Sequence, residues 1–376
     1  MKYYVIAGEA SGDLHGSNLI RAIHQFDAAA NLQIWGGDLM EAAGGKLRMH
    51  YRNLAFMGFV EVARNIRIIA KNLKFCKQDI LDFQPDALIL IDYPGFNLRI
   101  ATWAKKQGFK VIYYISPTIW AWHTSRIHQI KKAVDQMFVI LPFEPAFYEK
   151  YDYPVQYLGH PLIDVISHRP KSDSFLQKHQ LSPAPIIALL PGSRKQEISK
   201  LLAEMLKMVS LFPDYQFIIA AAPAIEKKIY EEIIQQQDLT NHARLHVVYH
   251  QTYDLLQHAH AALVTSGTAT LETALFKVPQ VVCYKTSALT FAIARQLVNI
   301  SYISLVNLIA NKVVVKELLQ EQMNTDNLQL ALQEILNPIY RKEMKIEYTK
   351  IEQQLGESGV ATRIAGKIWS FLNHIN

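Results

Sequence analysis

The stretch YYVIAGEASGDLHG, residues 3–16, decides the fold. Its first five residues form an apolar run of the kind found in a strand that is buried on both faces of a parallel sheet. A loop of small residues follows, and the next residues have the pattern of a helix. The spacing of Gly8, Gly12 and Gly16 fits neither the dinucleotide fingerprint nor the P-loop. The stretch therefore predicts the first strand–loop–helix unit of an α/β domain, with the nucleotide site elsewhere.

The same alternation of short apolar runs and helical stretches continues along the chain. Further runs lie at 32–36, 87–91, 110–115, 136–141, 155–159, 186–190, 216–221, 245–249, 261–265 and 280–284. The intervening lengths fit crossover helices between parallel strands. A polar stretch with three prolines, 168–185, separates two sets of runs and predicts a linker. We therefore expect two doubly wound α/β domains facing a central cleft, because ligands bind beyond the carboxyl ends of such strands.

The composition indicates a globular protein and excludes several classes. The chain has 376 residues, of which 50% are hydrophobic and 19% charged, which suits two domains. Its two cysteines form no C-x-x-C pattern, which argues against a zinc site and a disulfide scaffold. The stretch MKYYVIAGEASGD lacks the pattern of a signal peptide, and no run reaches the roughly 20 apolar residues that span a bilayer. We expect a cytoplasmic protein, whose net charge of +6 favours a phosphate ester, an acidic membrane or nucleic acid as partner.

Two turns in the second half are predicted to bind a nucleotide diphosphate. Each turn joins a strand to a helix, where free N–H groups attract anions. In the first turn, Arg194 can also clamp a diphosphate. Glu272, in the helix after the second turn, suits two ribose hydroxyls. The alternative is a pair of ordinary helix starts. Neither turn offers the carboxylates that Mg²⁺ needs, so we expect no metal and no cofactor. The turn residues are Gly192, Ser193 and Arg194 in LLPGSRKQEI, and Ser266, Gly267 and Thr268 in LVTSGTATLETAL.

The first half offers a general base and two tryptophans. Asp92 ends the buried run of LILIDYPGFN, residues 88–97, and could take a proton from a hydroxyl nucleophile. The alternative for Asp92 is an ordinary turn or cap. Trp120 and Trp122 follow another strand, where they either pack in the core or line a sugar or acyl pocket.

The segment 54–78 has the pattern of a surface that lies on anionic lipid. An apolar group is followed by a helix whose cations share one side. The alternative is a core helix with a solvated basic face. The residues concerned are Phe56, Met57 and Phe59, and Arg64, Arg67, Lys71 and Lys74.

Several motifs, in order along nearly the whole chain, resemble those of the lipid-A-disaccharide synthase family, inverting glycosyltransferases of the GT-B type in Gram-negative bacteria. The resemblance implies transfer of 2,3-diacylglucosamine from its UDP derivative to the 6-hydroxyl of 2,3-diacylglucosamine 1-phosphate (lipid X). The products would be a β-1,6-linked tetra-acyl disaccharide 1-phosphate and UDP. The enzyme would lie on the cytoplasmic face of the inner membrane. The motifs are AGEASGDLHG, MGFVEV, DYPGFN, SPTIWAW, LGHPL, LLPGSR, TSGTATLE and SLVNLIANKVVVKELLQ.

The resemblance also assigns domains and residue roles. It implies an acceptor domain over 1–167, a UDP-sugar domain over 186–345 and C-terminal helices over 346–376 that pack back on the first domain. Asp92 resembles the family's base on the acceptor hydroxyl, and Arg194, Ser266, Thr268 and Glu272 resemble its UDP contacts. Asn307, Glu317 and Gln320 are expected on the donor side. The acceptor side is expected to include Gly8, Ser11, Gly12, Asp13, Asn97, Trp120 and Trp122.

The chain departs from the family pattern at two positions, and several alternative functions have to be weighed against the resemblance. Gly95 stands where the family usually has a second carboxylate, which leaves Asp92 as the sole base. His15 stands where aliphatic residues are common. A different GT-B enzyme, such as a peptidoglycan glycosyltransferase or a UDP-sugar epimerase, would share the nucleotide turns but not DYPGFN or SPTIWAW. A dehydrogenase lacks its glycine fingerprint, and no nucleic-acid module is present. A homodimer is left open.

Overall fold

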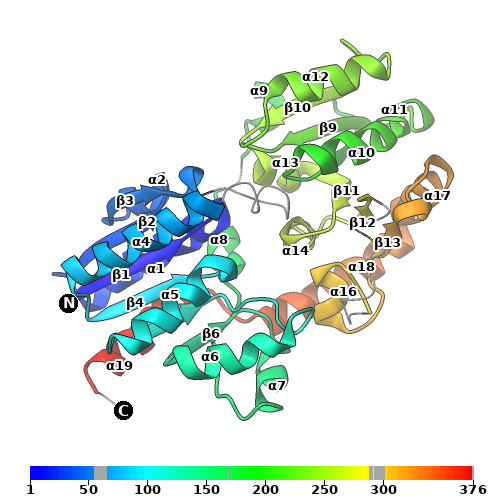
Figure 1. Ribbon diagram of the computed structural model, residues 1–376. Helices are drawn as coiled ribbons and strands as arrows, with labels where there is room; N and C mark the ends of the chain where they lie inside the picture. Colours follow the sequence, from blue (N-terminus) through cyan, green and yellow to red (C-terminus); the bar gives the residue numbers. More distant parts are fainter. Residues whose placement is uncertain (55–65, 168, 171, 288–290, 292–300, 375–376) are drawn as a thin grey trace. The chain divides into compact units, whose positions relative to one another are not determined.

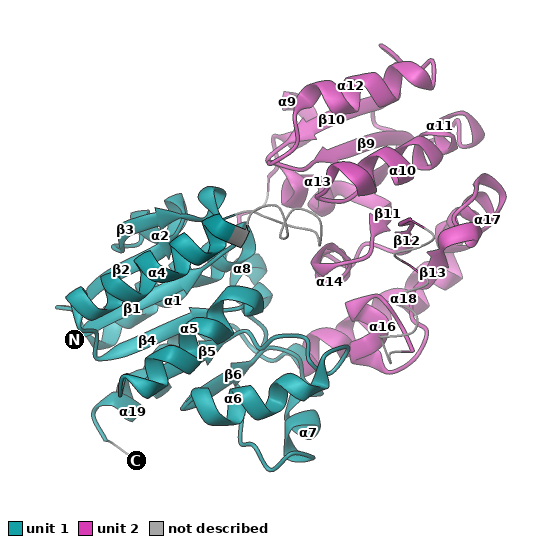
Figure 2. Ribbon diagram, in the orientation of Figure 1, with its two compact units in different colours: residues 1–167, 355–376 teal, residues 168–354 magenta. Residues whose placement is uncertain are grey.

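The computed structural model describes residues 1–54, 66–167, 169–170, 172–287, 291 and 301–374. The chain divides into two compact units (Figure 2). Unit 1 comprises residues 1–167 and 355–376, and unit 2 comprises 168–354. No helix among the described residues is long and apolar enough to cross a membrane.

Unit 1 is built on a seven-stranded parallel sheet in the order β3-β2-β1-β4-β5-β6-β7 (Figure 1). Val5 of β1 lies opposite Ile34 of β2 on one side and Ile89 of β4 on the other. β1 and β4 are buried almost throughout, as their continuous apolar runs predict. The strands are β1 (Lys2–Ala7), β2 (Asn31–Gly36), β3 (Lys46–His50), β4 (Ala87–Ile91), β5 (Val111–Tyr114), β6 (Gln136–Val139) and β7 (Gln156–Tyr157).

Helices cover both faces of this sheet. One core contains residues of α4, α5 and α6, and the other contains residues of α1, α2 and α19. Asp164 anchors α19, since its carboxylate accepts the backbone N–H groups of Gly359 (2.6 Å) and Ala361 (2.9 Å). The helices are α1 (Ala10–Phe26), α2 (Asp38–Ala42), η1 (Tyr51–Asn53), α4 (Ile66–Phe83), α5 (Pro94–Lys106), η2 (Thr124–Arg126), α6 (Ile127–Ala133), α7 (Glu144–Glu149), α8 (Pro161–Ser167) and α19 (Val360–Leu372).

Unit 2 has a six-stranded parallel sheet in the order β10-β9-β8-β11-β12-β13. Its strands are β8 (Ile186–Leu190), β9 (Gln216–Ala221), β10 (Leu245–Tyr249), β11 (Ala259–Thr265), β12 (Gln280–Tyr284) and β13 (Lys316–Leu319). Its helices are α9 (Phe175–Lys178), α10 (Lys195–Leu206), α11 (Met208–Leu211), α12 (Lys227–Gln236), α13 (Thr252–His258), α14 (Thr268–Leu275), α16 (Leu305–Ala310), η3 (Gln320–Gln322), α17 (Thr325–Leu336) and α18 (Pro338–Leu355). Both sheets are therefore doubly wound, which confirms the predicted fold class.

The boundaries of the units differ from the predicted ones. The predicted linker 168–185 groups with unit 2. Phe175 of α9 is buried in the core of that unit, and Arg169 pairs with Asp254 at 2.8 Å. At the other end, α18 runs through the predicted boundary at 345 and stays with unit 2 as far as residue 354, so that α19 is the C-terminal helix that packs on unit 1.

Candidate active site

In unit 1, the order of the strands changes direction between β1 and β4. The chain leaves β1 for β2 on one side, whereas β5 follows β4 on the other. Loops at such a switch point diverge beyond the carboxyl ends of the strands and leave a crevice for ligands. The loops after β1 and β4 also approach closely here. A Cβ added to Gly8 would lie 2.3 Å from the ring of Tyr93, so only glycine fits at position 8 without a shift of that ring.

Asp92 occupies a strained position at this switch point. Asp92 and Tyr93 have φ values of +45° and +47°, a left-handed conformation that is unfavourable for side chains other than glycine. Hydrogen bonds hold the Asp92 peptide there: its carbonyl accepts from Asn97 Nδ2 (2.8 Å) and from the Tyr113 hydroxyl (2.6 Å). Its N–H donates to the Tyr114 carbonyl at 3.0 Å. All three contacts involve the backbone of Asp92, and none of them involves its carboxyl group.

The pKa of the Asp92 carboxyl group is raised close to neutral pH. Burial, and then the negative charge of Glu9 across the crevice, raise the pKa of Asp92 to about 7. A general base works best when its pKa is near the working pH, so this carboxyl can both accept a proton and release it.

Gly95, in the next turn, is exposed, and an added Cβ there would meet no atom within 4 Å.

Three predicted acceptor-side residues make contacts within unit 1. Asp13 is buried, and its carboxylate accepts the backbone N–H groups of Gly37 (2.7 Å) and Met40 (3.1 Å) at the start of α2. Gly12 is also buried, and a Cβ added there would lie 3.0 Å from the Cβ of Ala7. Asn97 is fully buried beneath Asp92. These three residues are therefore buried parts of unit 1, and their described contacts are within that unit.

The other acceptor-side residues are more open. Ser11 is exposed in the first turn of α1. Trp120 is half-buried and meets Phe143 edge to face at 4.9 Å between ring centroids. Trp122 is 39% exposed, and its Nε1 donates to Thr118 Oγ1 at 3.2 Å. The two tryptophans therefore differ: Trp120 packs partly into unit 1, whereas the ring of the more exposed Trp122 contacts Arg126 and His123.

In unit 2, the corresponding switch point lies between β8 and β11. The turn after β8 is arranged around Glu197. Its carboxylate accepts the N–H of Ser193 at 3.2 Å and the Nη1–H of Arg194 at 3.1 Å. Gly192 has a φ of +114°, and an added Cβ would lie 2.6 Å from Glu197 Oε2. Arg194, at the start of α10, keeps 63% of its side chain exposed.

The turn after β11 lies at the same edge of the sheet, because β8 and β11 pair in parallel. Gly267 has a φ of +149°, and both Gly267 and Thr268 are exposed at the start of α14. The Ser266 hydroxyl donates to the Ile303 carbonyl at 3.0 Å and so does not cap the helix. Burial raises the pKa of Glu272 to about 7, against the opposing effect of a hydrogen bond from Tyr253. The two predicted nucleotide turns are thus brought together within unit 2.

Two of the remaining donor-side residues, Glu317 and Asn307, hold the loop that meets Ser266. Glu317 accepts the N–H of Ile303 and the hydroxyl of Ser304, at 3.0 and 2.7 Å. Asn307 is buried and donates to Glu317 Oε1 at 2.9 Å. Gln320 is buried, and its Oε1 accepts the N–H of Thr286 at 2.9 Å. Since Ile303 contacts both Glu317 and Ser266, this network fixes the turn after β11.

The predicted membrane residues are only partly described. Phe56, Met57, Phe59 and Arg64 lie outside the described residues. On α4, Cys76 and Ile80 are buried in the core, whereas Ile68 and Phe75 are 43% and 40% exposed. The cations Arg67, Lys71 and Lys74 of this helix are exposed.

Sequence reasoning missed the contribution of Tyr113. It lies in the apolar run of β5, where nothing marks its hydroxyl as a partner of the Asp92 carbonyl. Glu9 was visible as a polar residue of the first loop, but its effect on Asp92 depends on the pairing of β1 with β4. Within the described part of the chain, no group of three or more His, Cys, Asp or Glu side chains could hold a metal ion.

Comparison with known proteins agrees with this two-sheet arrangement and identifies its family. At the level of fold, the chain is similar to S. aureus MnaA in a co-structure with UDP, with a TM-score of 0.70 at 14% identity over 99% of this chain and 97% of that one. It is also similar to a Neisseria meningitidis UDP-GlcNAc 2-epimerase bound to UDP-GlcNAc, with a TM-score of 0.66 at 15% identity over 98% and 99%. These likenesses establish a two-domain fold of the GT-B type.

Sequence similarity is more specific. A protein of Trichlorobacter lovleyi named lipid-A-disaccharide synthase is 37% identical over 98% of this chain and 97% of its own length. The protein of the same name from Coxiella burnetii is 36% identical over 98% of both chains. A family model described as lipid-A-disaccharide synthetase matches residues 3–365. The chain belongs to the lipid-A-disaccharide synthase family.

Proposed function

We propose that this protein transfers 2,3-diacylglucosamine from UDP-2,3-diacylglucosamine to the 6-hydroxyl of 2,3-diacylglucosamine 1-phosphate in lipid A biosynthesis. The family membership over almost the whole chain carries this proposal. In the reaction, the acceptor oxygen attacks the anomeric carbon, the bond from that carbon to the UDP oxygen breaks, and the hydroxyl proton passes to a base. UDP leaves with the bonding electrons.

We assign the base to Asp92 and the UDP site to the switch point of unit 2. Asp92 has a pKa near neutrality and lies at the switch point of unit 1. Arg194 and the N–H groups at the starts of α10 and α14 can stabilise the charge that grows on the departing diphosphate. Glu272 would accept hydrogen bonds from the ribose hydroxyls. This assignment requires no metal ion.

Mass spectrometry of the product tests the proposed reaction. The purified protein, incubated with the two diacyl sugars in buffer with EDTA, should form one product with the mass of the tetra-acyl disaccharide 1-phosphate, together with UDP. Omitting either sugar should abolish the product. An isomerised UDP-sugar in place of the disaccharide would indicate an epimerase, and a strict requirement for Mg²⁺ would contradict the metal-free assignment.

The pH dependence of kcat/KM tests Asp92 and Glu9 together. A base must be ionised, so kcat/KM should rise with pH through about 7, the pKa of Asp92. Glu9→Gln removes a negative charge that raises this pKa, and the rise should therefore move to lower pH. Glu41→Gln, which removes an exposed carboxylate of α2, is the matched control and should leave the profile unchanged. Coincident profiles for Glu9→Gln and the parent would rule out this electrostatic coupling.

We further propose that the protein works at the cytoplasmic face of the inner membrane and docks there through the segment 54–78. Both proposed substrates carry two acyl chains, so the enzyme must meet them at a lipid surface. Exposed Ile68 and Phe75 lie on the same helix as the exposed cations Arg67, Lys71 and Lys74. Each cation near an anionic surface contributes roughly 1 kcal/mol, and less at higher salt.

Vesicle sedimentation distinguishes docking from a merely solvated basic face. With Arg64, Arg67, Lys71 and Lys74 all changed to Gln, binding to phosphatidylglycerol vesicles at low salt should fall strongly. The control variant removes four exposed cations of unit 1 away from this segment, Lys46, Lys106, Lys132 and Lys150, and should bind nearly as the parent does. Equal losses in the two variants would show a general charge effect, and no loss in the first would refute docking through this segment.

A further inference from the structure

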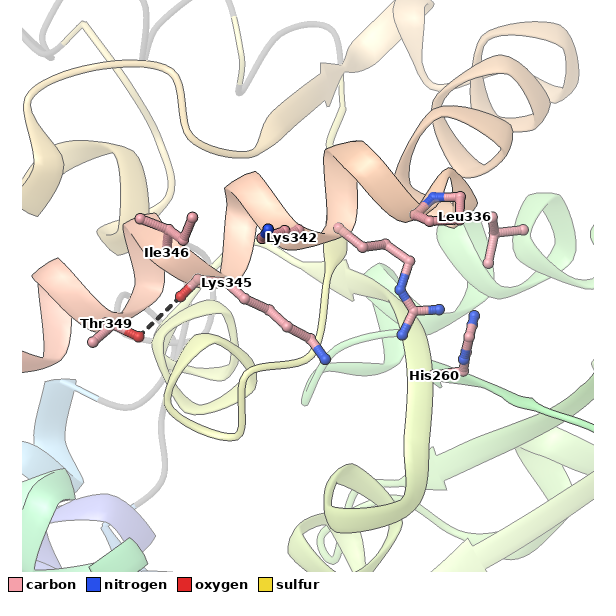
Figure 3. Close-up of a pocket in the computed structure, with 8 residues that line it drawn as sticks. His260, Leu336, Lys342, Lys345, Ile346 and Thr349 are labelled. Carbon is pink, nitrogen blue, oxygen red and sulfur yellow. Dashed lines mark hydrogen bonds between the residues drawn. The ribbon is translucent and has the colours of Figure 1, made fainter.

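Unit 2 contains a pocket with a volume of about 590 Å³ that the proposed transfer does not use (Figure 3). It lies between α18, the end of α17 and the start of β11. Arg341, Lys342 and Lys345 of α18 line it, together with His260 of β11. Figure 3 shows Lys345 extending from the helix on the side where His260 lies. The pocket is of the size that small-molecule sites usually have.

The sequence of α18 gives this helix two distinct sides. Met344, Tyr348 and Ile351 recur at helical spacing and are at most 4% exposed, so they form the packed side. The pocket is lined from another side, where Arg341 and Lys345 are four residues apart and therefore neighbours on the helix surface. Core packing thus explains Met344, Tyr348 and Ile351. It does not explain why Arg341 and Lys345 line the pocket.

In the part of the chain that the structure describes, the cations of the pocket form no ion pair with a carboxylate, whereas other lysines around α18 do. Glu347 pairs with Lys312 (2.6 Å) and Lys350 (2.7 Å), neither of which lines the pocket. Among the described residues, no carboxylate forms an ion pair with Arg341, Lys342 or Lys345. Burial lowers the pKa of Arg341. Burial, followed by the charges of Arg341 and Lys345, lowers the pKa of His260 to about 4. The pocket therefore holds uncompensated positive charge.

The pocket is separate from the proposed nucleotide site. His260 lies near the amino end of β11, whereas Ser266 follows the carboxyl end of the same strand. Six residues of extended strand span about 20 Å. The two turns proposed to bind UDP and this pocket therefore lie at opposite ends of the sheet of unit 2.

We propose that this pocket binds the phosphate group of a phosphate ester. A phosphate dianion matches a cluster of cations, and a guanidinium can bind two of its oxygens at once. The volume exceeds that of phosphate alone, and the apolar side chains of Leu336, Pro338 and Ile346 can contact the remainder of the ester. Such an ester could be a soluble metabolite or the headgroup of a lipid. The inference is independent of the transferase reaction, because it uses none of the residues assigned to it.

His260 provides a local reporter for a test with inorganic pyrophosphate as the probe. An anion beside Arg341 and Lys345 should offset their charge and raise the pKa of His260 towards its ordinary value near 6.5. In the full-length protein with ¹³C-labelled histidine, at about pH 6, the His260 resonance should move saturably towards the protonated form as pyrophosphate is added. The His260→Gln variant identifies the resonance.

A pair of variants separates the pocket from a general charge effect. Arg341→Gln with Lys345→Gln should weaken the pyrophosphate affinity at least about tenfold. This variant already has a higher His260 pKa, so its affinity is also measured by calorimetry, with saturating UDP present to occupy the proposed nucleotide site. The control, Lys312→Gln with Lys350→Gln, removes the same charge near the same helix and should bind like the parent. Transferase turnover should be unchanged in both variants, which keeps this test separate from that of the proposed reaction.

Vesicles identify the source of the phosphate ester. Binding to phosphatidylglycerol vesicles that is lost in the Arg341 and Lys345 variant, kept in the control and competed by pyrophosphate would support a lipid headgroup. Pyrophosphate binding without any such vesicle effect would support a soluble ester. Absence of a saturable His260 shift in the parent, or equal pyrophosphate affinity in the parent and the pocket variant, would overturn the proposal.

Discussion

The Asp92→Asn variant is expected to lose about 10²- to 10⁴-fold in kcat, because an amide keeps the shape of the carboxyl group but cannot accept the proton. The fold should survive this change for a specific reason. Asp92 has a φ of +45°, and asparagine is among the side chains that tolerate this conformation best. The hydrogen bonds from Asn97 and Tyr113 go to the Asp92 carbonyl, which the variant retains.

Three measurements make the Asp92→Asn result interpretable. The affinity for UDP should remain nearly intact, because the assigned UDP contacts are all in unit 2. The melting temperature should also be close to that of the parent. Asp82→Asn, which changes an exposed carboxylate of α4, is the matched control and should keep full turnover. If Asp92→Asn keeps more than half of the parent kcat, Asp92 is not the base.

Strands that are buried on both faces were predictable from sequence because their residues are continuously apolar. β4 and β8 coincide with the predicted runs at 87–91 and 186–190. The two strands that the pattern missed, β3 and β13, each lie at one edge of their sheet. The strands at the opposite edges, β7 and β10, fall within the predicted runs at 155–159 and 245–249. The residues of β3 and β13, KLRMH and KELL, mix charged and apolar side chains, since an edge strand is partly exposed to solvent. An apolar-run criterion therefore misses an edge strand whose residues mix charged and apolar side chains.

The candidate site was predictable where chemistry follows a strand directly, and not where it depends on contacts between distant residues. Asp92 and Arg194 follow buried strands, so the carboxyl-end rule for parallel sheets finds them. Asp13 is different, because it binds the start of α2, 24 residues further along the chain. No local sequence pattern around Asp13 predicts that contact. Glu317 likewise reaches Ser266 only through the peptide of Ile303.

This distinction also bears on how the donor-side residues act. The sequence predicts three residues on the donor side of the site: Asn307, Glu317 and Gln320. All three lie in unit 2, which also contains the two predicted nucleotide turns. The described hydrogen bonds of Glu317 and Asn307 join the loop at 303–304, the segment before β13 and each other. Gln320 instead accepts the backbone N–H of Thr286, after β12. We therefore expect Asn307 and Glu317 to act by positioning the turn at Ser266 rather than by direct contact alone. A buried network of this kind is rigid only while all of its partners are present.

The second large effect is expected for Arg194→Ala, which should weaken UDP binding and also reduce kcat by about 10²- to 10³-fold. Negative charge on the diphosphate grows as the bond to the anomeric carbon breaks, so a cation at this place stabilises the transition state more than the bound substrate. The loss should not arise from unfolding. The pair between Arg194 and Glu197 spans 3.1 Å, with 63% of the Arg194 side chain exposed, and exposed pairs of this kind contribute little to stability.

Lys200→Ala provides the control for this prediction, because Lys200 is an exposed cation on the same helix but lies beyond its first turn. It removes the same charge and should change neither UDP affinity nor kcat appreciably, since the attraction of a helix start for anions is local. Arg194→Lys adds a second comparison: it keeps the charge but loses the two parallel hydrogen bonds of a guanidinium, so its kcat should fall between those of the parent and Arg194→Ala. Steady-state kinetics with UDP inhibition constants measure both effects. A raised KM with an unchanged kcat in Arg194→Ala would mean that Arg194 holds substrate and transition state equally, and the assignment of the leaving-group charge to this residue would then be wrong.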